Sequence, residues 1–165
     1  MDTRTKIKSP KALKPLLRQL QKEGKKVVFT NGCFDILHVG HVRYLSKAKT
    51  CGDILVIALN SDHSVRRIKG KNRPIVSEND RAEVIASLEF VDFVTFFKED
   101  TPYNLISHLQ PDILIKGGDW KKDQIVGSDI VLKRGGKVKT IHYLKGKSTT
   151  HIISRIQKDM ANNPL

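Results

Sequence analysis

The feature that constrains the fold most is a regular alternation of short apolar runs with segments of helical spacing. The run at 53–59 is hydrophobic almost throughout, which is typical of a parallel strand covered on both faces. The expected strands are residues 26–30, 53–59, 91–97, 112–116 and 137–143. The expected helices are residues 9–23, 41–49, 61–68, 78–88 and 124–134, one that opens at 101–102, and a last one capped by Ser148. This alternation predicts an α/β fold, a doubly wound, Rossmann-like, five-stranded parallel sheet with helices on both faces.

The length of 165 residues is that of one ordinary domain, and 39% hydrophobic residues suffice for its core. We therefore expect a single domain over 1–165, with the helix at 9–23 packed on it and frayed ends at the first few residues and at 162–165. The apolar run from Ile54 to Leu59 is far shorter than the ~20 residues of a bilayer span. Two cysteines form neither a disulfide framework nor a four-ligand zinc site by themselves. These features predict a cytoplasmic protein without a membrane partner.

The charge is strongly positive, because 30 Lys and Arg face 17 Asp and Glu, for a net +13. Such a surplus favours an anionic partner: nucleic acid, an anionic membrane or small phosphorylated molecules. The basic residues are spread along the chain, with a local density at 66–73, and a solvated surface is the simplest role for most of them. Charge alone does not choose among these partners.

Polar, basic or glycine-containing segments follow the expected strands and a neighbouring helix. In an open parallel sheet, ligands bind beyond the carboxyl ends of the strands, where the strand order reverses. The segments to consider are residues 30–41, 60–62, 69–73, 116–120 and 146–150.

The most specific of these segments contains His38 and His41 on either side of Gly40. Two imidazoles three residues apart at a helix start share a face, and Gly40 lets a ligand approach the backbone. The free amides and the dipole at that end favour phosphate, and the histidines can stabilise the charge of a nucleotidyl-transfer transition state. The alternatives are two ordinary surface histidines, or a zinc site, which needs a third protein ligand. The preceding apolar strand and glycine turn favour phosphate.

A family resemblance is carried by four segments. Residues 32–41, GCFDILHVGH, resemble the signature of the nucleotidyltransferase superfamily that shares an HxGH motif, in particular its cytidylyltransferase-like branch. KGKNRPI at 69–75 with Arg81, KGGDW at 116–120 and GKSTT at 146–150 resemble the nucleotidyltransferase domain of bacterial heptose enzymes. The resemblance covers about residues 6–158. It implies transfer of AMP from ATP, accompanied by Mg²⁺, to D-glycero-β-D-manno-heptose 1-phosphate, giving ADP-heptose for lipopolysaccharide cores.

The resemblance also implies direct in-line attack by the acceptor phosphate on the α-phosphorus, so positioning and charge neutralisation carry the catalysis. The residues expected to be catalytic are His38, His41, Lys69 and Lys71. Those expected to bind the nucleotide are Thr30, Asn31, Gly32, Cys33, Phe34, Gly40, Lys116, Gly118, Asp119, Ser148, Thr149 and Thr150. Those expected to contact the acceptor are Asp35, Asn60, Asp62, Arg73 and Trp120.

Several of these residues have structural alternatives. Mg²⁺ would bridge phosphate oxygens and reach Asp35 through water, without a fixed protein metal site, but Asp35 equally suits a turn or cap. Ser148 suits a helix N-cap and Trp120 suits a core position. Turn roles are the alternative for Asn60, Asp62 and Asp119.

Two departures from the family pattern bear on the substrate and partners. Residues 143–145, Tyr-Leu-Lys, stand where glycerol-phosphate cytidylyltransferases carry an arginine and an acidic residue, although Lys145 or Lys147 can supply a positive charge. Trp120 is instead typical of that branch, so a glycerol-3-phosphate cytidylyltransferase is the alternative enzyme.

A nucleic-acid binder would explain the charge but not the histidine motif, so we do not expect nucleic acid as a partner. We expect a homodimer, and a separate heptose kinase and phosphatase in the same pathway.

Overall fold

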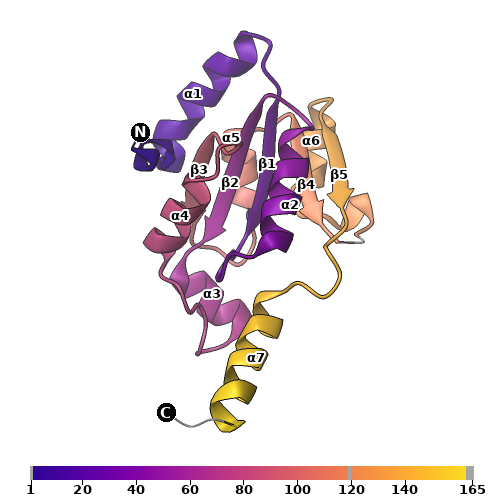
Figure 1. Ribbon diagram of the computed structural model, residues 1–165. Helices are drawn as coiled ribbons and strands as arrows, with labels where there is room; N and C mark the ends of the chain where they lie inside the picture. The colour runs from indigo at the N-terminus through magenta and orange to yellow at the C-terminus, as the bar shows by residue number, and fades with distance from the viewer. Residues whose placement is uncertain (1, 119, 163–165) are drawn as a thin grey trace.

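The computed structural model describes residues 2–118 and 120–162, which form a layered arrangement around one sheet (Figure 1). The sheet has five parallel strands in the order β3-β2-β1-β4-β5. The strands are β1 (Val27–Gly32), β2 (Ile54–Asn60), β3 (Phe93–Phe97), β4 (Ile113–Gly117) and β5 (Lys137–Ile141). The direction of strand succession reverses beside β1, which confirms the predicted doubly wound α/β fold and makes the β1–β4 boundary the expected place for a ligand.

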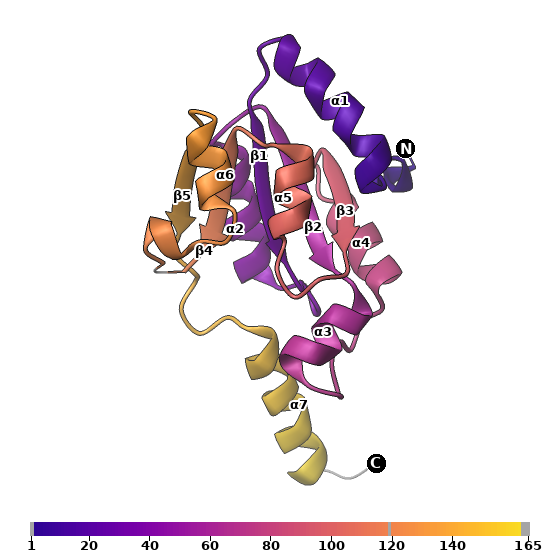
Figure 2. The ribbon, with the colours of Figure 1, turned by 180° about the vertical axis from the view of Figure 1, so that it is seen from behind.

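The helices cover both faces of this sheet, as Figures 1 and 2 show from opposite sides. They are α1 (Pro10–Lys22), α2 (Val39–Lys49), α3 (Asp62–Lys69), α4 (Glu78–Ala86), α5 (Tyr103–Leu109), α6 (Ser128–Lys133) and α7 (Thr149–Asn162). Successive β1 residues alternate between two cores, because strand side chains point to opposite faces. Val28 packs with α2 and α4, whereas Phe29 packs with α1, α5 and α6.

Serine caps explain where several helices begin. The hydroxyls of Ser9, Ser61 and Ser77 accept hydrogen bonds from backbone amides three residues later, at the starts of α1, α3 and α4. These caps satisfy amides that otherwise lack a partner in the first turn. The caps at Ser9 and Ser77 agree with the sequence-based expectation.

The predicted helix at 124–134 is wrong in its first half. The chain forms a 3₁₀ turn at Lys122–Gln124, and α6 starts only at Ser128. Gly127 separates the two with a φ of 83°, a left-handed conformation that stops the helix. A Cβ on Gly127 would lie 2.6 Å from Ile106, so a side chain there would also collide with α5. The predicted last strand is also too long, because β5 ends at Ile141.

The N-terminal end differs from the expectation of frayed residues. Thr3–Lys6 form a 3₁₀ turn, and Ile7 pairs with Val94 as a parallel bridge at the β3 edge. Asn162 is the last residue of α7, and the remaining residues 163–165 of the expected frayed end lie outside the described ones. Among the described residues, no helix has the length and apolar character needed to cross a membrane.

The carboxyl ends of the strands share one end of the molecule with α3 and the start of α7 (Figure 1). α7 extends away from the sheet, and none of its described side chains is buried. α1, α2, α4, α5 and α6 pack along the sheet faces, so the cavity at the strand ends is bounded by strand-to-helix loops, the end of α3 and the segment that leads into α7.

Candidate active site

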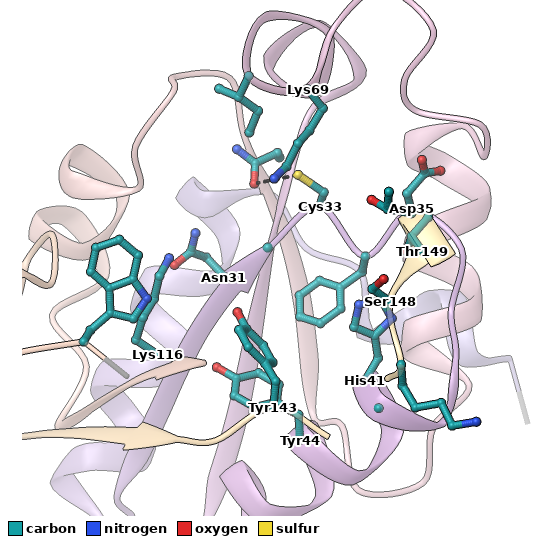
Figure 3. A pocket seen from close by; sticks show the side chains of 18 of the residues that line it. Asn31, Cys33, Asp35, His41, Tyr44, Lys69, Lys116, Tyr143, Ser148 and Thr149 are labelled. Atoms are coloured by element: carbon teal, nitrogen blue, oxygen red, sulfur yellow. Dashed lines mark hydrogen bonds between the residues drawn. The ribbon is translucent and has the colours of Figure 1, made fainter. Parts of the chain in front are cut away.

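A cleft of about 710 Å³ opens at the carboxyl ends of the strands, and Figure 3 shows it from close by. Its walls come from the loop after β1, the start of α2, the end of α3, the loop after β4 and the segment between β5 and α7. Most predicted site residues line it: Asn31, Gly32, Cys33, Phe34, Asp35, His38, Gly40, His41, Asn60, Lys69, Arg73, Lys116, Trp120, Ser148, Thr149 and Thr150. Segments far apart in the sequence therefore converge as the motif positions predicted.

Four predicted site residues lie outside this lining, and Asp119 lies outside the described residues. Thr30 is fully buried, and its hydroxyl shares a 2.7 Å hydrogen bond with the Tyr44 hydroxyl, so it supports the cleft floor. The Gly118 amide donates to a β5 carbonyl. Lys71 is exposed on the turn after α3, and Asp62 is held by an arginine described below. The structure therefore gives Thr30, Gly118 and Asp62 supporting positions around the cleft.

The two histidines stack at the first turn of α2. Their ring centroids are 3.8 Å apart with an interplanar angle of 22°, and the Phe34 ring meets His41 edge-on at 5.1 Å. His38 is also the N-cap of α2, because its Nδ1 accepts a 3.1 Å hydrogen bond from the Gly40 amide. An accepting Nδ1 places the proton of the neutral ring on Nε2, where it can be donated to a ligand. The cap also explains why α2 begins at Val39, two residues before the predicted start.

Both imidazoles are neutral at physiological pH. Burial lowers the pKa of His41 to about 4, and the neighbouring His38 adds to the effect. Burial also lowers the pKa of His38, with a smaller contribution from the positive charge of Lys147. Among the described residues, the buried Nδ1 of His41 has no hydrogen-bond partner. The pair therefore presents two neutral rings to the cleft and not two fixed cations.

His41 gives the fold a pH dependence that can be measured. Between its folded pKa of about 4 and the ordinary value of 6.5, the unfolded chain binds a proton that the folded chain does not. The free energy of unfolding should therefore fall as the pH is lowered through this range. Urea unfolding across the range should show a shallower fall for His41→Gln, whereas the exposed His63→Gln should behave like the wild type. If the free energy of unfolding changed equally with pH in all three proteins, His41 would not be the source of this pH dependence.

Asp35 holds the loop that carries Arg73 into the cleft. Its carboxylate accepts hydrogen bonds from the Ile75 amide at 2.8 Å, the Val76 amide at 2.9 Å and Nε of Arg73 at 2.5 Å. Burial alone would raise the pKa of Asp35, but the two amides and the guanidinium outweigh it, so its pKa is lowered. Asp35 is 3% exposed, and these donors occupy both of its oxygens. The arrangement favours its structural alternative over a role as a magnesium ligand, while Arg73, which is paired with Asp35 through Nε, also lines the cleft.

Arg81 is a supporting residue that the sequence reasoning quoted in a motif but did not assign. It is 1% exposed, and its guanidinium donates to the carbonyls of Cys33, Asn60 and Val76 and to the carboxylate of Asp62. These contacts join the ends of β1 and β2 to the segment before α4. The available signal was an arginine within the apolar stripe of a helix, where only a well-paired charge is tolerated.

Two tyrosines form another part of the cleft and were not predicted from the sequence. Tyr44 and Tyr143 line it, with ring centroids 6.1 Å apart, and the Tyr143 ring packs on the backbone of Gly117. Trp120 lines the cleft too, since a Cβ on Gly118 would lie 3.3 Å from Tyr143 and 3.4 Å from Trp120, and it is 50% exposed, so the core alternative for this residue is wrong. Burial lowers the pKa of the nearby Lys116, which marks it as a desolvated cation. Figure 3 shows Lys116 next to Asn31 in the cleft.

The segment before α7 closes the cleft near the histidines. Ser148 Oγ accepts a hydrogen bond from the His151 amide, which confirms its capping role. The Thr149 hydroxyl donates to the carbonyl of Ile36 at 3.3 Å and so fastens the start of α7 beside the start of α2. Ser148 and Thr149 lie above the His41 side of the cleft in Figure 3. Hydroxyls, helix-start amides and cations thus face one cavity, which is the chemistry of a phosphate site.

A family comparison agrees with this geometry. The family model described as Cytidylyltransferase-like matches residues 29–155, more than half of the chain. The chain belongs to the cytidylyltransferase-like family. The matched stretch of this cytidylyltransferase-like chain runs from β1 through the first half of α7 and so includes the whole cleft lining.

Similar proteins place the cytidylyltransferase-like chain more narrowly. It is 52% identical over 156 residues to "Bifunctional protein HldE" of Geotalea uraniireducens, covering 94% of this chain and 32% of that one. It is 53% identical over 152 residues to the HldE protein of Syntrophotalea carbinolica, covering 92% and 31%. The chain thus spans about a third of the length of these relatives. A crystal structure of the lipopolysaccharide core biosynthesis protein from Thermoplasma volcanium is similar, with a TM-score of 0.61 and 35% identity, covering 75% of this chain and all of that one.

Proposed function

We propose that the chain is an adenylyltransferase that transfers AMP from ATP to D-glycero-β-D-manno-heptose 1-phosphate and releases pyrophosphate. The observation that carries the proposal is the stacked, neutral histidine pair at the start of α2 inside a cation-lined cleft. Support for the heptose acceptor comes from about 50% identity to the HldE proteins over nearly the whole chain, together with the motif resemblance. The description of the Thermoplasma protein as a lipopolysaccharide core biosynthesis protein is consistent with the same kind of product.

The reaction is an in-line displacement at the α-phosphorus. An oxygen of the acceptor phosphate forms the new P–O bond, and the bond to the bridging oxygen of pyrophosphate breaks. Nε2–H of His38 and the ring of His41 stabilise the charge on the phosphate under attack, while Lys69, Arg73 and Lys116 neutralise charge around it. The site works by positioning, because its groups already converge before the substrates bind.

Magnesium belongs to this proposal as the companion of ATP. The described residues contain no cluster of three or more His, Cys, Asp or Glu side chains arranged for a metal, and the oxygens of Asp35 are occupied by donors. These residues do not offer a protein-held site, so phosphate oxygens would hold the ion, which usually keeps several waters. When bound, the ion neutralises phosphate charge.

A nucleotide and acceptor matrix tests the proposal. We expect pyrophosphate release with ATP and the heptose 1-phosphate, and little with CTP or GTP or with glycerol 3-phosphate. A tryptophan at position 120 is typical of the glycerol-phosphate cytidylyltransferases, so CTP and glycerol 3-phosphate are the alternative substrates in this test. Exclusive use of CTP with glycerol 3-phosphate would contradict the proposal. Salt-sensitive RNA or DNA binding that survives loss of both histidines, without any transferase activity, would favour the nucleic-acid alternative.

Two partners complete the proposal. The acceptor must come from a kinase that phosphorylates a heptose at its anomeric carbon, and a phosphatase acts in the same pathway. We further propose that two copies of the chain form a homodimer, which a molar-mass measurement in solution would test.

A further inference from the structure

A second cavity lies at the end of the sheet opposite the histidine cleft. Its volume is about 270 Å³, and it opens beside the starts of three neighbouring strands, β1, β4 and β5. Figure 1 shows these strand starts at the far end of the sheet from α3 and α7. Among the described residues, this amino-end pocket and the cleft share no lining residue, so the proposed reaction gives the pocket no role.

Positive charge dominates the amino-end pocket. Its lining includes four basic side chains from three separate segments: Lys26, Arg134, Lys137 and Lys139. Lys26 precedes β1, and Arg134 follows the last residue of α6. The two lysines of β5 share one face of that strand, because strand side chains alternate between faces. The described lining contains a single acid, Asp112, so the cations are in clear excess.

Within the described part of the chain, these four cations take part in no ion pair. Arg134 donates to the neutral side-chain oxygen of Gln110. Lys139 donates to the thiol sulfur of Cys51 at 3.8 Å. Neither partner neutralises the charge of its cation, so an external anion can still do so.

The carboxylate of Asp112 is already used within the fold. Its Oδ2 accepts hydrogen bonds from the Val27 amide at 2.9 Å and from Nε2 of Gln21 at 3.0 Å. These contacts tie α1 to the start of β1. One engaged acid against four cations leaves the pocket positively charged.

A purely structural role explains only one of the cations. The last turn of a helix favours a positive charge near its free carbonyls, which suits Arg134 at the end of α6. The three lysines come from strands and the segment before β1, where this effect is absent. Like charges around one cavity repel each other, and an anion between them removes the repulsion. A ligand also finds room beside Gly135, where an added Cβ would meet nothing within 4 Å.

We propose that the amino-end pocket binds a small phosphorylated anion, with its phosphate between Arg134 and the two lysines of β5. Arginine offers paired donors that match two phosphate oxygens, and the lysines add point charges. The pocket has about 270 Å³ against about 710 Å³ for the cleft, which favours phosphate or a small phosphate ester over a nucleotide. The inference does not depend on the proposed function, because the two cavities are separate.

An NMR titration of the full chain with inorganic phosphate, at constant pH and ionic strength, reads both cavities at once. We expect saturable shifts of the backbone amide signals of Gly135, Gly136 and Lys137, which lie at the amino-end pocket. The amides of Gly32 and Gly40 report binding in the cleft separately. A parallel titration with glycerol 3-phosphate distinguishes the two sources of the phosphate group. Tighter binding of the ester identifies a phosphorylated molecule as the ligand, and equal or weaker binding identifies phosphate itself.

Lys137→Met combined with Lys139→Met should weaken phosphate binding at this pocket by about tenfold, because one exposed ion pair contributes up to about fivefold. The matched control combines Lys133→Met with Lys158→Met, two exposed lysines outside the pocket lining, and lowers the net charge equally. The control should bind phosphate like the wild type. Amide spectra that are unchanged away from the substitutions show that both variants are folded.

Three results would overturn the inference. The first is a wild type without saturable shifts at residues 134–137. The second is an equal loss of affinity in both double variants, because general charge and not the pocket would then attract phosphate. The third is a set of shifts confined to Gly32 and Gly40, which would leave the proposed transferase reaction untouched.

Discussion

We expect His38→Asn to lose most transferase activity while its free energy of unfolding stays close to that of the wild type. The asparagine side-chain oxygen can replace Nδ1 of His38 as the acceptor of the Gly40 amide, so α2 keeps its N-cap. The variant has no imidazole Nε2–H to donate to the phosphate. Loss of one such transition-state donor lowers kcat by about a hundred- to a thousandfold. Pyrophosphate release and urea unfolding, measured on the same preparation, check both halves of the result.

Two further variants separate the cap from the chemistry. His38→Ala should lose activity and also about 1 kcal/mol of stability, because the cap disappears. His63→Asn, an exposed histidine of α3 outside the cleft lining, should change neither property. If His38→Asn kept nearly full activity, the imidazole would not be a phosphate donor.

The second large effect is expected at Arg81. Arg81→Met should lower the free energy of unfolding by about 3–5 kcal/mol, the cost of breaking a buried charged network by removing one partner. The methionine fills much of the space but leaves three backbone carbonyls and the Asp62 carboxylate without their donor. Because Cys33 and Asn60 line the cleft, the folded fraction of the variant should also have a lower kcat.

Chemical unfolding of Arg81→Met, beside Arg66→Met as a control, measures this effect. Arg66 is exposed on α3, so its substitution should change stability by only about 0.5 kcal/mol. A similarly small change for Arg81→Met would show that the guanidinium does not organise the ends of β1 and β2.

The order of strands and helices could be predicted because it depends on local patterns. β2 and most of β1 are short apolar runs buried on both faces, and the serines before α1 and α4 mark the starts of these helices through short-range hydrogen bonds. The break at Gly127 could not be predicted in this way. Gly127 adopts a left-handed conformation where a side chain would collide with Ile106 on α5, and this tertiary restriction is not contained in the periodicity around residue 127.

The same distinction between local patterns and tertiary contacts applies to the candidate site. His38, Gly40 and His41 could be found because their spacing alone places them at one helix start. The partners of Asp35 could not, because they lie about forty residues further along the chain and depend on how that loop folds back. The sequence pattern therefore located the cleft, whereas the division between ligand-facing and supporting side chains required the three-dimensional contacts.

The central claim is that the histidine pair at the start of α2 holds the triphosphate. A crystal structure with Mg²⁺ and a non-hydrolysable ATP analogue tests it most directly. The account predicts the α-phosphate within hydrogen-bond distance of the imidazoles of His38 and His41. A triphosphate bound elsewhere on the protein, with both imidazoles free of contact, would contradict it.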